Sequence, residues 1–185
     1  MTVETNRDRS ALALLAPFAI GGAVAVALGV YGRLHEPTGI AVNVAGFSGP
    51  LAAKTWMATG GLVLALVQVA SALAMYGKLP GVSHAPSWVS GLHRWSGRLA
   101  FLFVVPVALH WLYALGFESY SGRVLVHSLL GCFFFGAFVA KMLLLSRKST
   151  PGWVLPVVGG LVFTALVGLW LSSSLWYFTT IGVKV

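Results

Sequence analysis

Two histidines, His110 and His127, lie inside long apolar runs of the sequence. An ionisable side chain at membrane depth is unfavourable, and such residues usually face a cavity, a partner or a cofactor. If the two runs form consecutive antiparallel helices, both imidazoles lie about 5–10 Å below one surface at 1.5 Å per residue. Two neutral imidazoles from different helices make the six-coordinate iron of an electron-transferring b-type haem. We therefore expect His110 and His127 to be axial haem ligands, with Gly131, one turn after His127, leaving room for the flat ring.

A second group of candidate residues lies in the segment Leu92-His93-Arg94-Trp95-Ser96-Gly97-Arg98. The four-residue spacing of His93 and Gly97 repeats that of His127 and Gly131. Arg94 and Arg98 are suited to bind the two propionates of a haem at the membrane interface. This segment therefore predicts a second, inner haem or propionate site, with His93 as its iron ligand.

The spacing between His93 and His110 limits how these two residues can act together. They are 17 residues apart, which on a straight helix places them about 100° apart in direction and roughly 25 Å apart in height. They do not share one face unless Pro106 kinks the helix. The remaining candidates for a second inner ligand are His84, Met75 and Met142.

The same histidines have an interpretation that needs no metal. In a helical bundle, a histidine near a helix end often hydrogen-bonds a neighbouring helix or an interfacial water. Neighbouring helices also pack about 8–10 Å apart, which is tight for two imidazoles with iron between them. His110 could instead pair with His35 in the loop after the first apolar run. Both interpretations remain open at this point.

Transmembrane helices are the elements that must position these residues. The chain has 185 residues, of which 58% are hydrophobic and 9% charged, so little sequence is left for a water-facing surface. A membrane-crossing helix needs about 20 apolar residues. The runs that meet this length predict an all-α polytopic bundle, a single domain with five helices over residues 11–32, 55–77, 92–117, 124–145 and 153–179. The single cysteine, Cys132, lies in the fourth, which excludes an intrachain disulfide.

The distribution of lysine and arginine predicts the orientation, because basic residues near helix ends are retained in the cytoplasm. With the N-terminus inside, eight basic residues flank the inner ends and four flank the outer ends, which favours an inner N-terminus and an outer C-terminus. The net charge of +8 is thus explained by topology and by contact with anionic membrane lipid, and nucleic-acid binding is not expected. A cleaved signal peptide at the first run is the alternative, but the run exceeds the usual signal core of about 7–15 residues.

Two resemblances to known families follow from these residues. The stretch His93 to Phe101, leading to His110 and then Tyr113, resembles the haem-bearing helices of cytochrome b561-like and ferric-reductase-like membrane proteins, although its histidine spacing departs from the ferric-reductase pattern. A likeness over most of the chain is to an uncharacterised bacterial membrane family. It is carried by the segments Leu92–Leu112, His127-Ser128-Leu129-Leu130-Gly131-Cys132 and Gly152-Trp153-Val154-Leu155-Pro156. The first resemblance implies b haems held by histidines, and the second implies no established activity.

We therefore expect a multi-pass protein of the bacterial cytoplasmic membrane that holds one or two b haems. It would pass electrons between a quinol, or a membrane redox partner or larger complex, and an acceptor on the outer face, as the electron-transfer component of an oxidoreductase. The alternative is a cofactor-free accessory subunit of a larger membrane complex. A small transporter is disfavoured, because Glu4, Asp8, Glu36 and Glu118 all lie outside the predicted membrane core.

Overall fold

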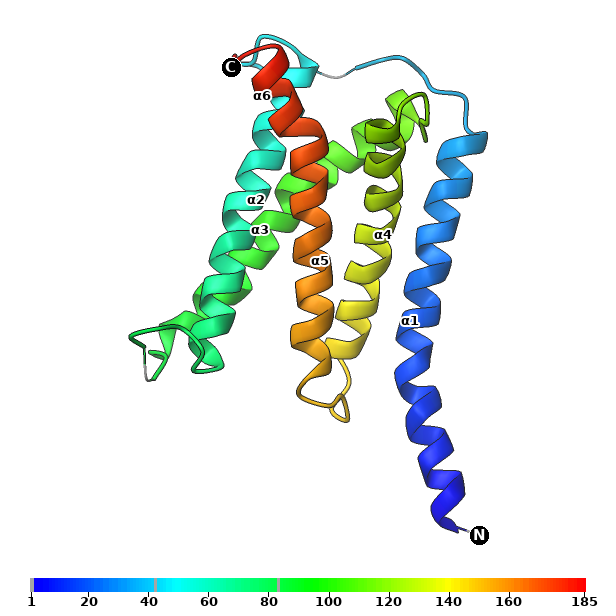
Figure 1. Ribbon diagram of the computed structural model, residues 1–185, viewed down its shortest axis with the longest axis vertical. Coiled ribbons are helices and arrows are strands. Elements are labelled where there is room, and N and C mark those ends of the chain that lie inside the picture. The colour runs from blue at the N-terminus through cyan, green and yellow to red at the C-terminus, as the bar shows by residue number, and fades with distance from the viewer. Residues whose placement is uncertain (1, 42, 83) are drawn as a thin grey trace. The chain divides into compact units, whose positions relative to one another are not determined.

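The computed structural model describes residues 2–41, 43–82 and 84–185, with side chains from residue 14 onward. These residues form helices and no strands. The helices are α1 (Thr2–Leu34), α2 (Pro50–Met75), α3 (Trp88–His110), α4 (Gly122–Leu145), α5 (Val154–Trp170) and α6 (Trp176–Thr180), with π-helical turns η1 (Trp111–Leu115) and η2 (Leu171–Leu175) (Figure 1).

Five helical segments in this described part of the chain are long and apolar enough to cross a membrane. They are Leu14–Leu34, Pro50–Met75, Trp88–Leu115, Gly122–Leu145 and Val154–Thr180. The predicted all-α, five-helix class is therefore confirmed, and the chain is a multi-pass membrane protein whose exposed apolar side chains contact lipid. The observed helices differ from the predicted ranges at their ends, most at α1, which begins with a polar segment, and at α2, which begins before Lys54.

The two ends of α2 have local causes. Gly49 is extended and is followed by Pro50 in the first helical turn, where a missing N–H costs nothing. At the other end, Gly77 has a φ of +63°, and the N–H of Lys78 donates to the carbonyl of Leu73 at 2.8 Å. This left-handed glycine with a bond back to the last turn is the usual helix stop.

The contacts divide the chain into two compact units, which are described separately. The first unit comprises Met1–Pro37 and Leu115–Ser172, and its packed helix pairs are α1 with α4 and α4 with α5. Figure 1 shows α1 and α4 side by side. The second unit comprises Thr38–Ala114 and Ser173–Val185, and its packed pair is α2 with α3.

In the first unit, glycines bring α1 and α4 into close contact. A Cβ added to Gly21 would lie 2.4 Å from the carbonyl oxygen of Gly136, and one added to Gly136 would lie 2.5 Å from that of Gly21. Only hydrogen fits at either position, as in other close helix crossings in membranes. Where α4 meets α5, Leu144, Val154 and Val158 form a buried apolar cluster.

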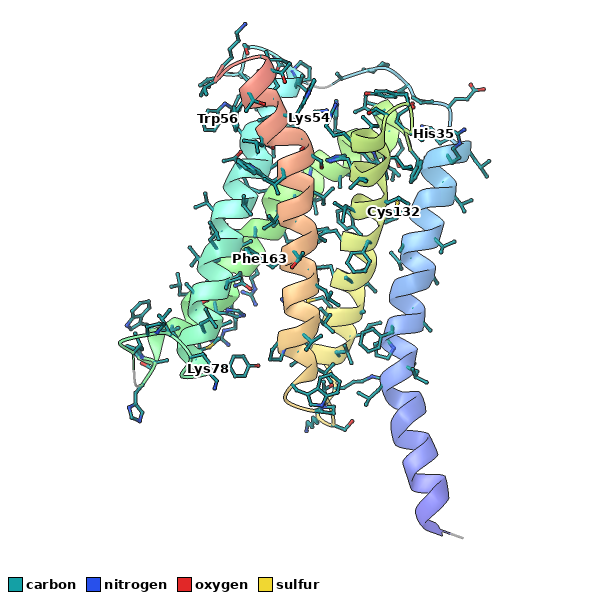
Figure 2. The ribbon with its side chains drawn as sticks, viewed as in Figure 1. His35, Lys54, Trp56, Lys78, Cys132 and Phe163 are labelled. Atoms are coloured by element: carbon teal, nitrogen blue, oxygen red, sulfur yellow. The ribbon has the colours of Figure 1, made fainter. Side chains whose placement is uncertain are left out.

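In the second unit, Gly61 on α2 allows α3 to approach, because an added Cβ would lie 3.0 Å from a methyl of Val104. The C-terminal segment packs on the start of α2. The Trp56 indole donates to the carbonyl of Lys184 at 2.9 Å, and the Ser174 hydroxyl donates to that of Thr55 at 3.4 Å (Figure 2).

Candidate functional site

His127 lies on α4 and is half-buried, with its Nδ1 2.8 Å from the hydroxyl of Ser172 in η2. The Ser172 hydroxyl is also bonded to its own helix, to the carbonyl of Gly168 at 2.7 Å and to that of Leu169 at 3.1 Å. A hydroxyl has one proton, and these carbonyls can only accept. When Ser172 donates to the helix, it can only accept from the Nδ1–H of His127, and a neutral ring then carries its lone pair on Nε2.

His93 is held in the same way in the other unit. It lies inside α3 and is half-buried, and its Nδ1 is 2.9 Å from the hydroxyl of Ser71 on α2. Ser71 donates its own proton to α2, where the carbonyl of Val67 is 2.7 Å away and that of Gln68 is 3.1 Å away. When Ser71 keeps this bond to α2, His93 donates from Nδ1 and a neutral ring carries its lone pair on Nε2.

The two histidine–serine pairs thus share one arrangement on different helices. In each pair the histidine is on one helix, and the serine is on a neighbouring helical segment of the same unit, with its hydroxyl bonded to its own backbone. Histidines that bind metals usually donate their second ring nitrogen to a hydrogen-bond acceptor, which selects the tautomer and the ring orientation. With Ser71 and Ser172 as acceptors, both rings would have the protonation pattern of an Nε2 metal ligand.

The glycines four residues after each histidine differ in their surroundings. A Cβ added at Gly131 would meet only Leu169, at 4.0 Å. At Gly97 the added atom would lie 3.1 Å from the amide of Gln68. The space beside Gly97 is thus already filled by a side chain, whereas Gly131 has room next to it.

Gln68 links α2 to α3 around His93. Its side-chain amide donates to the carbonyl of His93 and, at 2.9 Å, to the buried hydroxyl of Ser96. Ser96 donates in turn to the carbonyl of His93 at 3.2 Å. Polar groups of these helices therefore bond to one another across the helix pair, as required where no water is present.

The two arginines predicted to bind propionates are exposed on α3. The guanidinium carbon of Arg98 lies 5.0 Å from the centre of the Trp95 ring, a cation–π distance. Arg94 is one helical turn before Arg98, so both cations are available to an anionic group at this end of the helix.

His110 is the last residue of α3 and immediately precedes the π-helical turn η1. It belongs to the second unit and His127 to the first, so the pairing of these two residues stays a prediction. The alternative pairing of His110 with His35 also stays a prediction. His35 follows α1, and its ring stacks on Tyr31 with centroids 5.1 Å apart.

The other sequence candidates for ligands lie at the surface of their units. His84 is exposed in the connection between α2 and α3, Met75 is exposed at the end of α2, and Met142 is exposed on α4. Among the described residues, no three side chains of histidine, cysteine, aspartate or glutamate come together as a metal cluster.

The hydrogen-bond partners of the two histidines, Ser71, Gln68 and Ser172, were not predicted from the sequence. Their signal was present, since a polar side chain within an apolar span needs a partner on another helix. The sequence did not indicate which helix would supply that partner.

Comparison with curated proteins and with solved structures finds no match. A family described as of unknown function, DUF6529, matches residues 14–185, which include every histidine and every helix that could cross a membrane. The likeness to an uncharacterised membrane family is thereby confirmed at the level of a family without assigned function: the chain belongs to the DUF6529 family.

Proposed function

We propose that this protein is a haem-b electron carrier of the bacterial cytoplasmic membrane. It would exchange single electrons between a quinol or membrane redox partner and an acceptor on the outer face. The observation that supports the proposal most is the pair of histidines, His127 and His93, each with Nδ1 within hydrogen-bond distance of a serine hydroxyl that also bonds its own helix. With the serine as acceptor, Nδ1 is protonated, which is the pattern that iron ligation through Nε2 requires.

The proposed roles follow from the chemistry of the side chains. His127 and His93 would ligate iron, with His110 as the sequence-based candidate for a further ligand. Arg94 and Arg98 would bind propionates. A bound haem would supply the one-electron chemistry, while the protein would orient the ligand rings, exclude water and bury the ring among apolar helices.

The first test is the visible spectrum of the protein, purified in detergent after expression with added haem precursor. We expect a Soret band in the oxidised form and a sharp α band after reduction with dithionite. The pyridine haemochrome assay would count haems per chain, with one or two expected. A colourless protein that is folded and helical by circular dichroism would contradict the proposal.

Ligand variants then assign the iron sites. His127→Ala, His110→Ala and His93→Ala are each expected to abolish or shift a haem signal, whereas Lys78→Ala, at an exposed residue that is no candidate ligand, should leave the spectrum unchanged. If none of the three histidine variants differed from the Lys78 control, the assigned ligands would be wrong.

A cofactor-free accessory subunit is the second candidate, and one observation favours it. Each histidine–serine bond joins neighbouring helical segments within a unit, so it stabilises the bundle without iron. In that case the histidine variants would lower the unfolding temperature of a protein that never shows a haem spectrum. The two candidates therefore differ in spectrum before any variant is made.

A further inference from the structure

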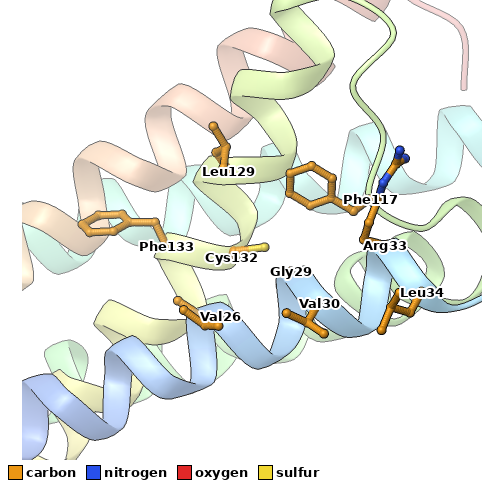
Figure 3. Close-up of a pocket in the computed structure, with 10 residues that line it drawn as sticks. Val26, Gly29, Val30, Arg33, Leu34, Phe117, Leu129, Cys132 and Phe133 are labelled. Carbon is orange, nitrogen blue, oxygen red and sulfur yellow. The ribbon is translucent and has the colours of Figure 1, made fainter.

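An apolar groove runs between α1 and α4 in the first unit, with a volume of about 650 Å³. Its walls are Val26 and Val30 on one side and Leu129 and Phe133 on the other, all of them substantially exposed. Cys132 lies at its base, on the side of α4 that faces α1 (Figures 2 and 3). The groove is thus an open furrow that presents carbon atoms to the membrane.

Backbone contacts at both ends explain why the two helices leave this space. At one end, Gly21 and Gly136 hold α1 against α4. At the other, the N–H of Phe117 donates to the carbonyl of Gly32 at 2.7 Å. Between these contacts, Gly29 presents no side chain, and an added Cβ would still be 3.6 Å from the Cys132 sulfur. The groove is therefore a consequence of glycine placement in α1.

One cation lies at the end of this apolar groove. Arg33 lines the groove in the last turn of α1, and Figure 3 shows it at the opposite end from Val26 and Phe133, beyond Phe117. Seven residues separate Val26 from Arg33, or about 10 Å along the helix. Among side chains from residue 14 onward, no carboxylate forms an ion pair with Arg33. A guanidinium without a protein counter-ion is suited to bind a phosphate.

We propose that this groove binds one anionic phospholipid, with an acyl chain along Val26, Val30, Leu129 and Phe133 and the headgroup phosphate on Arg33. An apolar groove with a cation at its end is complementary to an amphiphile whose acyl chain fills the groove and whose single negative charge lies at the cation. A neutral isoprenoid matches the furrow alone, and a soluble phosphate matches the arginine alone. This inference is independent of whether the protein holds haem.

The test is competition between two lipids that differ only in headgroup charge. The protein is placed in nanodiscs with equal amounts of phosphatidylglycerol and phosphatidylcholine of identical chains, transferred to detergent, and its retained lipid is measured by native mass spectrometry. We expect phosphatidylglycerol to be retained about fivefold over phosphatidylcholine, which corresponds to about 1 kcal/mol for one cation at an anionic lipid.

Variants separate the headgroup contact from the chain contact. Arg33→Gln should bring the lipid ratio close to one, and Arg33→Lys should keep most of the preference. Lys184→Gln, which removes a cation in the other unit, is the matched control and should behave like wild type. Val26→Trp fills the furrow while keeping Arg33, so it should reduce retention of both lipids.

Cys132 provides a second readout, because it is the only cysteine and lies at the base of the groove. Its reaction with uncharged N-ethylmaleimide should be slower in phosphatidylglycerol discs than in phosphatidylcholine discs, and Arg33→Gln should remove that difference.

Several results would overturn the proposal: an equal lipid ratio for wild type, or a preference that survives Arg33→Gln. A retained neutral isoprenoid insensitive to Arg33→Gln would do so as well. So would a dimer, measured by light scattering, that Val26→Trp dissociates, because the occupant would then be a second copy of the chain.

Discussion

At the scale of single residues, the most informative groups are the two serines, Ser71 and Ser172. Each hydroxyl bonds its own helix and lies within hydrogen-bond distance of a histidine Nδ1 on a neighbouring helix. Serine has one proton, so a hydroxyl that donates it to the helix can only accept from the histidine. The direction of this one bond thus sets which nitrogen of His93 or His127 carries hydrogen.

Replacing Ser172 by alanine tests this arrangement. Ser172→Ala removes the hydrogen-bond partner of the His127 Nδ1, and we expect a loss of about 0.6 kcal/mol in the free energy of unfolding, the mean for such bonds in membranes. Ser146→Ala removes an exposed hydroxyl that bonds only its own helix and should have little effect. Thermal unfolding in detergent, followed by circular dichroism, makes the comparison. If haem is bound, the position of the reduced α band should change in Ser172→Ala only.

At the scale of helices, the packing of α1 on α4 depends on hydrogen-sized residues. Gly21→Ala would place a methyl 2.4 Å from the backbone oxygen of Gly136, a contact that cannot be relieved by a side-chain rotation. We expect a loss of about 1–3 kcal/mol, typical of overpacking. The neighbouring glycine is the control, because a Cβ at Gly22 meets nothing within 4 Å and alanine is the better helix former. Equal unfolding temperatures for Gly21→Ala and Gly22→Ala would show that the close approach is absent.

The end of α2 allows a similar comparison in the second unit. Gly77→Ala forces a side chain into the left-handed region, at a cost of about 1–2 kcal/mol. Gly91→Ala, inside α3 with open space around the added atom, should be neutral or slightly stabilising. Chemical unfolding of both variants in the same detergent would measure the difference. A tolerated Gly77→Ala would mean that another residue ends the helix.

The helices were largely predictable and their partners were not. Hydropathy located all five spans, because a run of about 20 apolar residues has the length and composition of a membrane-crossing helix. It missed the start of α2 at Pro50, since Lys54 was assigned to the preceding loop, and it missed η1 and η2, since a π-helical turn leaves composition unchanged. His93, His110 and His127 were recognised by their type within or beside apolar runs. Their polar partners were not recognised, because the sequence does not indicate which helical faces pack together; these partners are Gln68, Ser71 and Ser172.

At the scale of the whole molecule, the span number has a topological consequence. Five is odd, so the five candidate spans of the described residues predict that the two termini lie on opposite sides of the membrane. The basic residues predict an inner N-terminus and an outer C-terminus. In a Cys132→Ala background, we expect Val185→Cys to react with a membrane-impermeant maleimide on intact cells, and Thr2→Cys to react only after permeabilisation. The reverse pattern would contradict the orientation while leaving the five spans intact.

The two units alternate along the chain, and this order limits when each helix pair can form during synthesis. During synthesis α2 and α3 emerge in succession, so this helix pair can associate as soon as both have entered the bilayer. The partner of α1 is α4, which follows only after α2 and α3 have been inserted. Newly made α1 must therefore remain in the lipid with the glycine face around Gly21 uncovered until ribosomal elongation has passed residue 145. The contacts of α1 with α4 can thus form only after α4 has been made, and a nascent chain arrested before α4 would carry a first helix without this partner.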